Sequence, residues 1–408
     1  MKTVVICPDQ RPEARMLGRL TPLALVPVLG RTFLSRWLAH LSDSGFREVI
    51  ILASDRPDSI RTAVGAGEEW GLRIQVISEA SELSQEKARA RFGVDRAILM
   101  DHLPGHPDLP LFDRPSGFFD ALRHVAPALH SQRVGSRELS PGIWVGLHSR
   151  TAPTARLHAP CWIGQSVWIG SDAVVGPHAY VEDSAMIDTE AEVTGSWVGP
   201  NTYVGSFTSV TRSLAWADGL LNHETGSFTE IVDPFLLGDL RGQSAFNRKS
   251  SPLGRLAALA FLILTFPIPL VAAVLAIWSR QSLVSRLRAV VPSAITTSGL
   301  RESTYHELNG FRGLARRWPQ LWKIVVGEFT WVGNRPITRE QAATLETEFE
   351  QLWLSAPVGL VSLADAHGCA DRFDDEARAH SSYYASRRSR AVDRSILRWA
   401  VLRIPPTP

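Results

Sequence analysis

The sequence predicts a multidomain protein with three kinds of structure: an α/β domain, a parallel β-helix and an α-rich, membrane-associated part. Three observations support this prediction. Strands alternate with helices over the first hundred residues, an aliphatic residue recurs at every sixth position in the middle of the chain, and residues 256–278 form a long apolar run without a charge. A chain of 408 residues is also too long for one ordinary domain.

These patterns divide the chain into four parts. We expect an α/β domain over residues 1–140 and a β-helix over 141–240. A linker with a membrane helix is expected over 241–300, and an α-rich domain over 301–408.

Composition narrows the class of protein. The net charge of +2 gives no support for nucleic acid as a partner. The cysteines Cys7, Cys161 and Cys369 are scattered, with neither a CxxC pair nor a nearby histidine cluster, which argues against a disulfide framework or a zinc site and favours a reducing compartment. Because the N-terminus lacks a long apolar segment, we expect no secretory signal and a cytoplasmic position for the soluble parts.

The first part reads as alternating strands and helices. Strands are expected at 4–7, 48–53, 72–77 and 97–100, and helices at 33–41 and from Asp58 or Ser59 to about Gly67. Such alternation is typical of parallel pairing and predicts a doubly wound sheet.

A family resemblance is carried by residues 19–52, RLTPLALVPVLGRTFLSRWLAHLSDSGFREVIIL. Pro27, Val28, Gly30 and the helix that runs to Gly45 resemble the turn and helix of the sugar-nucleotide pyrophosphorylase (nucleotidyltransferase) family. The resemblance implies that fold, with nucleotidyl transfer as an activity to consider. The family's glycine-rich phosphate loop is replaced by CPDQRPEARMLGR, and Asp101 follows a strand where the family has a metal-binding aspartate.

A six-residue repeat follows. Six residues advance an α-helix by about 600°, so the repeated side chains would not share one helical face. The period instead predicts a left-handed hexapeptide β-helix, with the aliphatic side chain inside and glycine at the corner between flat sides. The aliphatic positions are Leu157, Ile163, Ile169, Val175, Val181, Ile187 and Val193, and after a one-residue slip Val198, Val204 and Val210.

Two functions fit a hexapeptide β-helix. Such helices often occur in acyltransferases that use a histidine as general base, for which His158, His178 and His223 are the candidates. They also follow nucleotidyltransferase-like domains, where they serve assembly, and we favour this second interpretation. A homo-oligomer through the β-helix is therefore one expectation.

The apolar run at 256–278 is long enough for a membrane helix of about 34 Å. Pro267 and Pro269 lie near its middle, where proline bends a helix. Positive charge collects on the cytoplasmic side of membrane segments, and here both flanks are positive, so we expect a re-entrant hairpin rather than a span. The flanking residues are Arg248, Lys249, Arg255, Arg280, Arg286 and Arg288.

The C-terminal part carries a second resemblance. The segment RRWPQLWKIVVGEFTWVGNRP, residues 316–336, resembles the bacterial sugar transferase family, the polyprenyl-phosphate phosphoglycosyl transferases with a re-entrant membrane helix. The matching residues are Pro319, Gln320, Leu321, Gly327, Val332, Gly333, Arg335 and Pro336, followed further on by Pro357, Gly359, Tyr383, Tyr384, Ser389 and Asp393.

This resemblance implies a chemistry. In the family an aspartate attacks the β-phosphate of a nucleotide sugar, the adjacent glutamate holds Mg²⁺, and the phosphosugar passes to polyprenyl phosphate. Here Arg316 and Arg317 align with the acidic pair, and with Arg335 they are the candidates for binding phosphate or nucleotide sugar. Glu328 and Glu307 are the nearest acids, so no catalytic residue is assigned and Mg²⁺ is expected only if the chain is active.

The last segment, residues 387–404, carries six arginines and one aspartate. Val392, Ile396, Trp399 and Leu402 fall on one helical face. A basic amphipathic helix fits either a membrane surface or a core-packing helix with a solvated arginine face, and the sequence favours neither.

Together these patterns predict a protein on the cytoplasmic face of the bacterial inner membrane that acts in envelope or exopolysaccharide biosynthesis. The leading hypothesis is a catalytically degenerate scaffold or nucleotide-sugar-binding relative that works with other glycan-assembly proteins at the lipid surface. One alternative is an active phosphoglycosyl transferase that uses polyprenyl phosphate. The other is nucleotidyl or acyl transfer by the N-terminal half.

Overall fold

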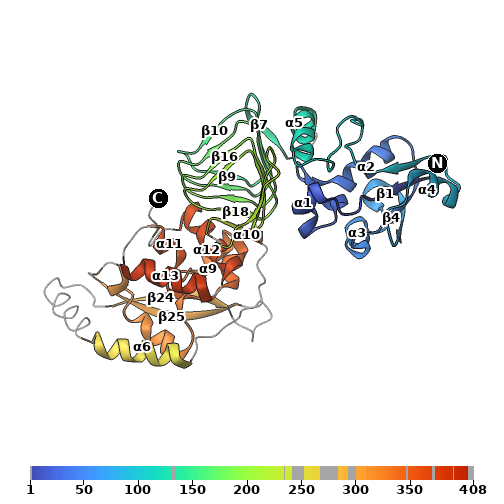
Figure 1. The fold of residues 1–408 in the computed structure, drawn as a ribbon. Helices are drawn as coiled ribbons and strands as arrows, with labels where there is room; N and C mark the ends of the chain where they lie inside the picture. The colour runs from blue at the N-terminus through green and yellow to red at the C-terminus, as the bar shows by residue number, and fades with distance from the viewer. Residues whose placement is uncertain are drawn as a thin grey trace. The chain divides into compact units, whose positions relative to one another are not determined.

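The computed structural model divides the chain into two compact units, Met1–Asp239 and Leu240–Pro408. Figure 1 shows the α/β domain and the β-helix of the first unit in blue to green, and the second unit in yellow to red. The residues that the structure describes are 2–129, 135–233, 235–240, 252–266, 284–292, 300–309, 311, 313–345, 348–369, 373–388 and 390–402.

The N-terminal domain is built on a parallel sheet with the strand order β5-β4-β1-β6. Helices connect these strands, so the predicted α/β domain with a parallel sheet is confirmed. The strands are β1 (Lys2–Ile6), β4 (Glu48–Ala53), β5 (Arg73–Ser78) and β6 (Ala97–Leu99), and the helices are α1 (Arg15–Leu20), α2 (Phe33–Asp43), α3 (Pro57–Val64), α4 (Gln85–Phe92) and α5 (Gly117–Leu129).

The repeat region forms coils of short parallel strands, as the six-residue period predicted. Each strand pairs with the strand that follows it by three, which gives three flat sides. One side contains β8 (Ile143–Val145), β11 (Cys161–Ile163), β14 (Ala179–Val181), β17 (Trp197–Val198) and β20 (Ser213–Trp216). The second contains β9 (Arg150–Thr151), β12 (Trp168–Ile169), β15 (Met186–Ile187) and β18 (Thr202–Val204), and the third β10 (Arg156–Leu157), β13 (Val174–Val175), β16 (Glu192–Thr194) and β19 (Ser209–Thr211).

Short antiparallel strands complete the β-helix. The strands β7 (Arg137–Ser140), β21 (Gly219–Asn222) and β22 (Phe228–Glu230) extend the first side, and β23 (Leu237–Asp239) pairs with β18 on the second. The aliphatic side chains of the repeat lie inside and are buried from Ile163 to Val210. The one-residue slip is visible in the register, because Tyr180 pairs with Trp197 seventeen positions later whereas Trp162 pairs with Tyr180 after eighteen.

Gly164 allows successive coils to approach closely, whereas the left-handed corners mostly hold other residues. A Cβ on Gly164 would lie 2.8 Å from the backbone nitrogen of Asp183 in the next coil. The left-handed backbone conformation instead falls on Ser166, Asp172 and His178, whose φ angles are between 54° and 57°. The corner position therefore accepts polar side chains as well as glycine.

An aromatic ladder joins the β-helix to the N-terminal domain. Trp144, Trp162, Tyr180 and Trp197 pair in register along the first side of the β-helix. On this ladder α5 packs edge to face, with ring centroids 5.2 Å apart for Phe118 and Trp197. Three rings of the ladder belong to the same buried cluster as the α/β core, so the first unit has a continuous apolar core across both folds.

A buried carboxylate also crosses this boundary. The backbone N–H groups of Leu29 and Gly30 each donate to Glu182 at 2.7 Å, and Trp197 Nε1 donates to it at 3.1 Å. Leu29 and Gly30 form the turn between β2 (Pro27–Val28) and β3 (Arg31–Thr32), and both have positive φ. Two successive N–H groups in such a turn form an anion-binding concavity.

The second unit contains a long antiparallel ribbon, a short parallel pair and several helices. The ribbon is β24 (Val284–Pro292) with β25 (Leu300–Leu308), and the pair is β26 (Thr330–Val332) with β27 (Gly359–Val361). The helices are α6 (Pro252–Leu264), α8 (Gln320–Val326), α9 (Arg339–Ala343), α10 (Glu348–Gln351), α11 (Leu363–Ala366), α12 (Asp375–Arg387) and α13 (Arg390–Leu402).

The terminal helix α13 packs into the second unit. Val392 and Ile396 are buried, and Arg394 and Arg398 are exposed. The apolar face predicted from the sequence is therefore a core-packing face, which was one of its two interpretations.

The apolar run is described only in its first half. Helix α6 covers residues up to Leu264, and Pro267, Pro269 and the rest of the run to residue 278 lie outside the described residues. Within the described ranges we find no helix with the length and apolar character needed to cross a bilayer.

The Glu182 contact predicts a pH-dependent stability. Burial, reinforced by the charge of Asp183, outweighs the three hydrogen bonds and raises the pKa of Glu182 from 4.5 to about 7. The folded state thus binds a proton that the unfolded state releases between pH 4.5 and 7. Stability should fall by about 3 kcal/mol as the pH rises through this window, measured by tryptophan fluorescence during unfolding of the full chain.

The matched variants are Glu182→Gln and, as a control, Glu192→Gln at an exposed carboxylate of the same β-helix. Glu182→Gln should remove this part of the pH dependence, whereas Glu192→Gln should keep it. An unchanged pH profile in Glu182→Gln would show that Glu182 does not titrate in this range.

Candidate functional site

The candidate site lies on the buried face of β25 in the second unit. Ser303, Tyr305 and Glu307 alternate along this strand and are all buried. Alternate residues of a strand share one face, so these three side chains face the same way. Helix α8 packs beside this strand and brings Gln320 and Lys323 to it.

Arg316 pairs with Glu307. The Nε atom of Arg316 lies 2.7 Å from a carboxylate oxygen of Glu307, and Gln320 Nε2 donates to the other oxygen at 3.1 Å. The Glu307 side chain is 7% exposed, whereas that of Arg316 is 39% exposed. The structure therefore brings two of the predicted site residues together as an ion pair.

Arg317 is held more firmly. It donates to both carboxylate oxygens of Asp365, at 2.6 and 2.9 Å, and to the backbone carbonyl of Leu360 at 2.9 Å. Burial acts to raise the pKa of Asp365, but the hydrogen bonds and charge of Arg317, together with Ser362, outweigh it and hold that pKa below its ordinary value. The planar fork of Arg317 thus forms a bidentate, buried ion pair.

Arg335 joins the same electrostatic environment. Burial and the charge of Glu307 raise the pKa of Tyr305 to about 12, against the opposing charges of Arg335, Arg317 and Arg316. All three predicted phosphate-binding arginines therefore lie within electrostatic range of one tyrosine. The backbone carbonyl of Arg335 also accepts a hydrogen bond from Trp353 Nε1 at 3.2 Å.

Glu328 follows α8 and contacts the ribbon at Ser303. It accepts hydrogen bonds from Lys323 Nζ at 2.8 Å and from Ser303 Oγ at 2.6 Å, and these two bonds lower its pKa. Ser303 and Glu307 are four residues apart on one strand, which corresponds to about 13 Å. The two weak acidic candidates therefore do not converge into a pair.

Gly333 and Gly359, two glycines that match the transferase pattern, bring their backbones into close contact. A Cβ on Gly333 would lie 2.3 Å from the carbonyl oxygen of Pro357, and one on Gly359 would lie 2.1 Å from the nitrogen of Gly333. Only glycine at both positions lets the VGNRP segment and the PVG turn approach this closely. The buried Asn334 ties the junction further, because its amide donates to the carbonyls of Trp353 and Ser381 at 3.0 Å.

Tyr384, which with Asp393 matches the end of the transferase pattern, contacts the VGNRP segment at Val332. The Tyr384 hydroxyl lies 2.7 Å from Asp393 Oδ1 and donates to the carbonyl of Val332 at 3.2 Å. It thereby links α12, α13 and β26. Ser389 lies outside the described residues.

Mg²⁺ does not fit the arginine-rich end of this site. The positions that align with the family's acidic pair carry arginines, and the two carboxylates that meet them, Glu307 and Asp365, are each already bonded to a cation. In the part of the chain that the structure describes, no group of three metal-ligating side chains includes either of them. The geometry supports binding of an anion more than coordination of a divalent cation.

The three histidines proposed for acyl transfer differ in their surroundings. His158 is exposed, and His178 occupies a left-handed corner of a coil, where burial and the charge of Arg123 lower its pKa. His223 stacks on Phe119 with ring centroids 4.2 Å apart, and its Nε2 lies 3.0 Å from the Gly195 carbonyl oxygen. The described contacts of His223 are structural.

Asp101 lies beside His102, its hydrogen-bonded neighbour. Among the described residues it belongs to no group with the ligand separations of a metal site.

A cavity of about 1000 Å³ lies at the carboxyl ends of β1 and β4. This is the edge where open α/β sheets bind ligands, and Arg11, Arg15, Arg19 and Arg56 line it. Three of these arginines pair with acids: Arg11 with Glu82, Arg56 with Asp55, and Arg19 with Asp218 and Glu230.

Sequence reasoning missed two residues that organise the site. Asp365 lies 48 positions after the arginine it binds, and nothing in its sequence environment marks it as a partner. Asn334 lies within VGNRP between the matching residues Gly333 and Arg335, and its burial was not predicted.

The buried pair predicts a large loss on removal of its acid. Asp365→Asn leaves the charge of Arg317 buried without its counterion and should cost about 3 kcal/mol in chemical unfolding of the full chain. The control Glu302→Gln removes the acid of an exposed pair, 3.8 Å from Arg339, and should change stability by less than about 0.5 kcal/mol.

The pH dependence of stability further distinguishes the Arg317–Asp365 pair from the exposed Arg339–Glu302 pair. Because the folded pKa of Asp365 lies below 3.8, the contribution of this pair is complete above about pH 4 and is lost as the pH falls through the folded pKa. Equal losses in the two variants would contradict the assignment of Arg317–Asp365 as the dominant ion pair.

Comparison with known proteins found one family match. Residues 316–404 match the family model of bacterial sugar transferases. A search of curated proteins returned no match. Among solved structures, a mutant of perosamine N-acetyltransferase from Caulobacter crescentus, in complex with CoA and GDP-perosamine, is 11% identical.

The alignment to that acetyltransferase covers 42% of this chain and 93% of the other, with a TM-score of 0.13, and at this score it carries no argument. The family match, in contrast, covers the ion-paired arginines, the paired glycines and the Tyr384 junction described above. Residues 316–404 therefore carry the sequence pattern of the bacterial sugar transferase family.

Proposed function

We propose that this protein is a membrane-associated, sugar-transferase-like protein of bacterial envelope polysaccharide biosynthesis that binds nucleotide sugar without transferring it. The observation that carries the proposal is the charge inversion at the site. Where the family has an acidic pair, this chain has Arg316 and Arg317, and both are ion-paired with carboxylates from other elements.

The inversion removes the reaction's first step. Arginine stays protonated, so it can neither attack a phosphate nor ligate Mg²⁺. Glu307 and Glu328 are each already bonded to basic or amide groups, and Glu328 contacts the ribbon at Ser303 rather than near Glu307. A carboxylate in such a pair is a weaker nucleophile, because its negative charge is stabilised by its neighbours.

The same inversion supports binding. The guanidinium group matches the planar oxygens of phosphate and forms charge-assisted hydrogen bonds with them. Arg316 is the more accessible of the two adjacent arginines, and its charge acts on Tyr305 together with that of Arg335. We therefore assign the diphosphate of a nucleotide sugar to Arg316 and Arg335, and a structural role to the buried Arg317.

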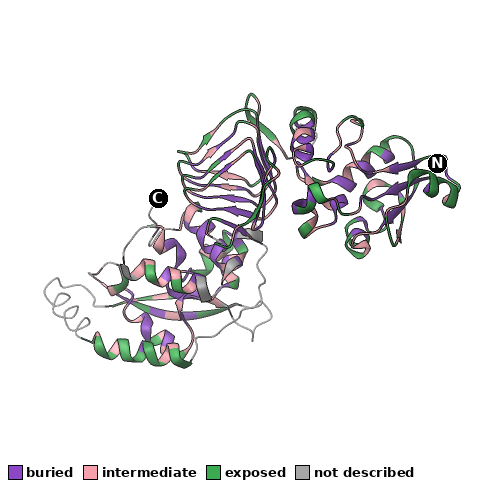
Figure 2. Ribbon diagram, in the orientation of Figure 1, coloured by how far each residue is buried: buried purple, intermediate pink, exposed green. Residues whose placement is uncertain are grey.

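Helix α6 supports membrane association. After Arg255 every residue of the helix is apolar, and Figure 2 shows most of the helix in the colour of exposed residues. A soluble protein rarely exposes such a continuous apolar surface. The exposed large side chains are Leu253, Leu256, Leu259, Phe261, Ile263 and Leu264 on α6, Phe266 just after it, and Trp322 and Val326 on α8.

The helix is attached to the sugar-transferase-like domain by tryptophans. Trp331 Nε1 donates to the carbonyl of Gly254 at 2.9 Å, and Trp318 Nε1 donates to Thr265 Oγ1 at 2.9 Å. We propose that residues 256–278 form the re-entrant anchor expected from the sequence. This anchor would hold the arginine site at the cytoplasmic face of the inner membrane, near polyprenyl phosphate and partner proteins of glycan assembly.

Binding without turnover is the central prediction. Full-length protein in membrane vesicles should bind a nucleotide sugar from a panel, measured by equilibrium binding with a radiolabelled ligand. It should release no nucleoside monophosphate when Mg²⁺ and polyprenyl phosphate are added. Arg335→Ala should weaken binding at least tenfold, since a charge-assisted contact is worth about 1.5 kcal/mol or more.

The matched control is Arg339→Ala, an exposed arginine four positions away whose pair with Glu302 is loose. It should leave binding unchanged. Mg²⁺-dependent release of nucleoside monophosphate would establish an active phosphoglycosyl transferase instead, and acyl transfer abolished by His178→Ala would assign the activity to the N-terminal half.

Membrane attachment is tested by flotation. The double variant Leu256→Asp with Ile263→Asp places two charges on the exposed surface of α6 and should shift the protein from the vesicle fraction toward the soluble fraction. The control, Ala258→Ser, changes the buried position of the same helix without adding a charge. Equal flotation of the double variant and the wild type would remove α6 from the proposed membrane surface.

A further inference from the structure

A thiol, a carboxylate and an imidazole lie close together where α11 meets α12. One ligand atom each from Cys369, Glu376 and His380 lies within 4.8 Å of the other two. Cys369 and His380 are buried, and Glu376 is half-buried. None of these three residues takes part in the arginine site or belongs to the motifs that resemble the transferase family.

The backbone positions the thiol. Helix α11 ends in a Schellman motif, in which Gly368 has φ of 79° and its N–H donates to the Asp365 carbonyl at 3.2 Å. The N–H of Cys369 donates to the Ala364 carbonyl at 2.8 Å and completes the motif. The backbone of Cys369 is therefore held in place by the C-terminal cap of α11.

The other two ligands come from one helix face. Glu376 and His380 are four residues apart on α12, so they lie one turn apart on the same side. The helix begins at a well-formed cap, since the Asp374 side chain accepts a hydrogen bond from the Ala377 N–H at 3.0 Å. Two rigid helix ends thus converge on one point.

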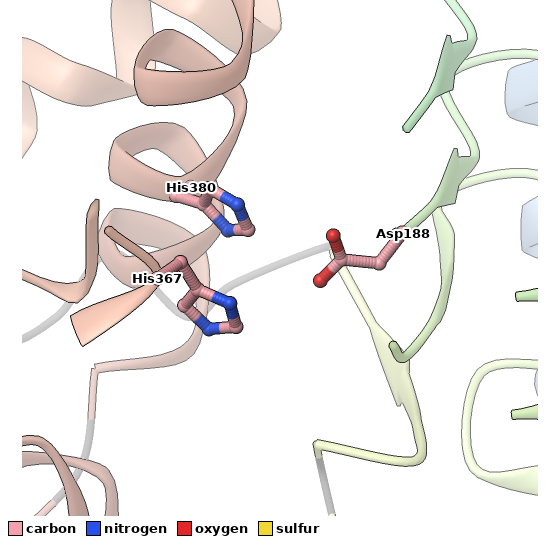
Figure 3. A group of neighbouring side chains, drawn as sticks. All are labelled: Asp188, His367 and His380. Carbon is pink, nitrogen blue, oxygen red and sulfur yellow. The ribbon is translucent and has the colours of Figure 1, made fainter. Parts of the chain in front are cut away.

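The imidazole of His380 is oriented by a neighbouring ring. Figure 3 draws His367 and His380 face to face, with ring centroids 4.2 Å apart and an interplanar angle of 15°. This stacking holds the plane of the His380 imidazole against that of His367. Asp188, also drawn in Figure 3, belongs to the first unit, where it accepts a hydrogen bond from the Tyr203 hydroxyl at 2.6 Å.

We propose that Cys369, Glu376 and His380 bind a zinc-class divalent metal ion. Thiolate, imidazole and carboxylate are all zinc ligands, whereas thiolate disfavours Mg²⁺ and Ca²⁺. Zinc bonds of about 2.0 to 2.3 Å place tetrahedral ligand atoms roughly 3.5 Å apart. The ligand atoms of the three residues lie within 4.8 Å of one another, so shifts of about 1 Å would bring them to that spacing. Binding releases the thiol proton of Cys369 to solvent and leaves the fourth coordination position to water.

The ion would join α11 to α12. Helix α11 carries Asp365, the counterion of Arg317, so the metal would steady the acid that holds the arginine site. This role is independent of whether the protein transfers sugar phosphate.

The experiment uses full-length protein purified without chelator. Metal analysis should find about one zinc per chain, and Co²⁺ substitution should produce the sulfur-to-metal charge-transfer absorption of a thiolate ligand. Cys369→Ala should abolish that absorption, and His380→Ala and Glu376→Gln should each weaken Zn²⁺ binding at least tenfold. Cys161→Ala, which removes another buried thiol, should leave both readouts unchanged.

The cobalt spectrum of the wild type keeps the test decisive even if a ligand variant fails to fold. A wild-type protein that takes up Co²⁺ without thiolate absorption, or takes up none, would overturn the proposal. So would a folded Cys369→Ala protein with unchanged zinc content. His367→Ala should preserve the thiolate absorption, because His367 is assigned no bond to the metal.

Discussion

The burial of carboxylates, and the donors that each buried carboxylate requires, organises both units of this protein. An ionised carboxylate without partners is too costly to bury, so each one draws elements of the chain toward it. In the first unit Glu182 draws a turn of the α/β domain onto the β-helix. In the second, Glu307 and Asp365 each draw one of two adjacent arginines. Apolar burial supplies most of the stability, but these contacts select the register in which the elements meet.

In the first unit the turn that binds Glu182 is the one by which the chain resembles nucleotidyltransferases. Leu29 adopts a left-handed conformation that is uncommon for a branched residue, and the hydrogen bond from its N–H to Glu182 helps to hold it there. The same domain lacks the glycines that would cradle a phosphate, and arginines around its cavity pair with acids. The turn instead binds the β-helix through Glu182, next to the surface that the aromatic ladder covers.

The sequence predicted those features that local periodicity encodes. The six-residue period located the inner residues from Ile163 to Val210, and the alternation of strands and helices gave the parallel sheet. The aromatic ladder is also encoded, since Trp144, Trp162 and Tyr180 recur every eighteen residues, but the six-residue period of the inner aliphatic residues does not reveal it. Asp365 and Asn334 could not be predicted, because their partners are distant in sequence and chain folding alone brings them together. Cys369, Glu376 and His380 lie close in sequence, but without a CxxC pair the scattered cysteines argued against a zinc site.

The charge inversion in the second unit also explains why the family-like scaffold persists without its acidic pair. An acid at position 316 would face the buried Glu307, and two carboxylates at that distance repel. An acid at position 317 would face Asp365 in the same way and would leave the Leu360 carbonyl without this donor. Removing one member of either pair leaves its partner's charge without a counterion, so each arginine and its carboxylate are expected to change together.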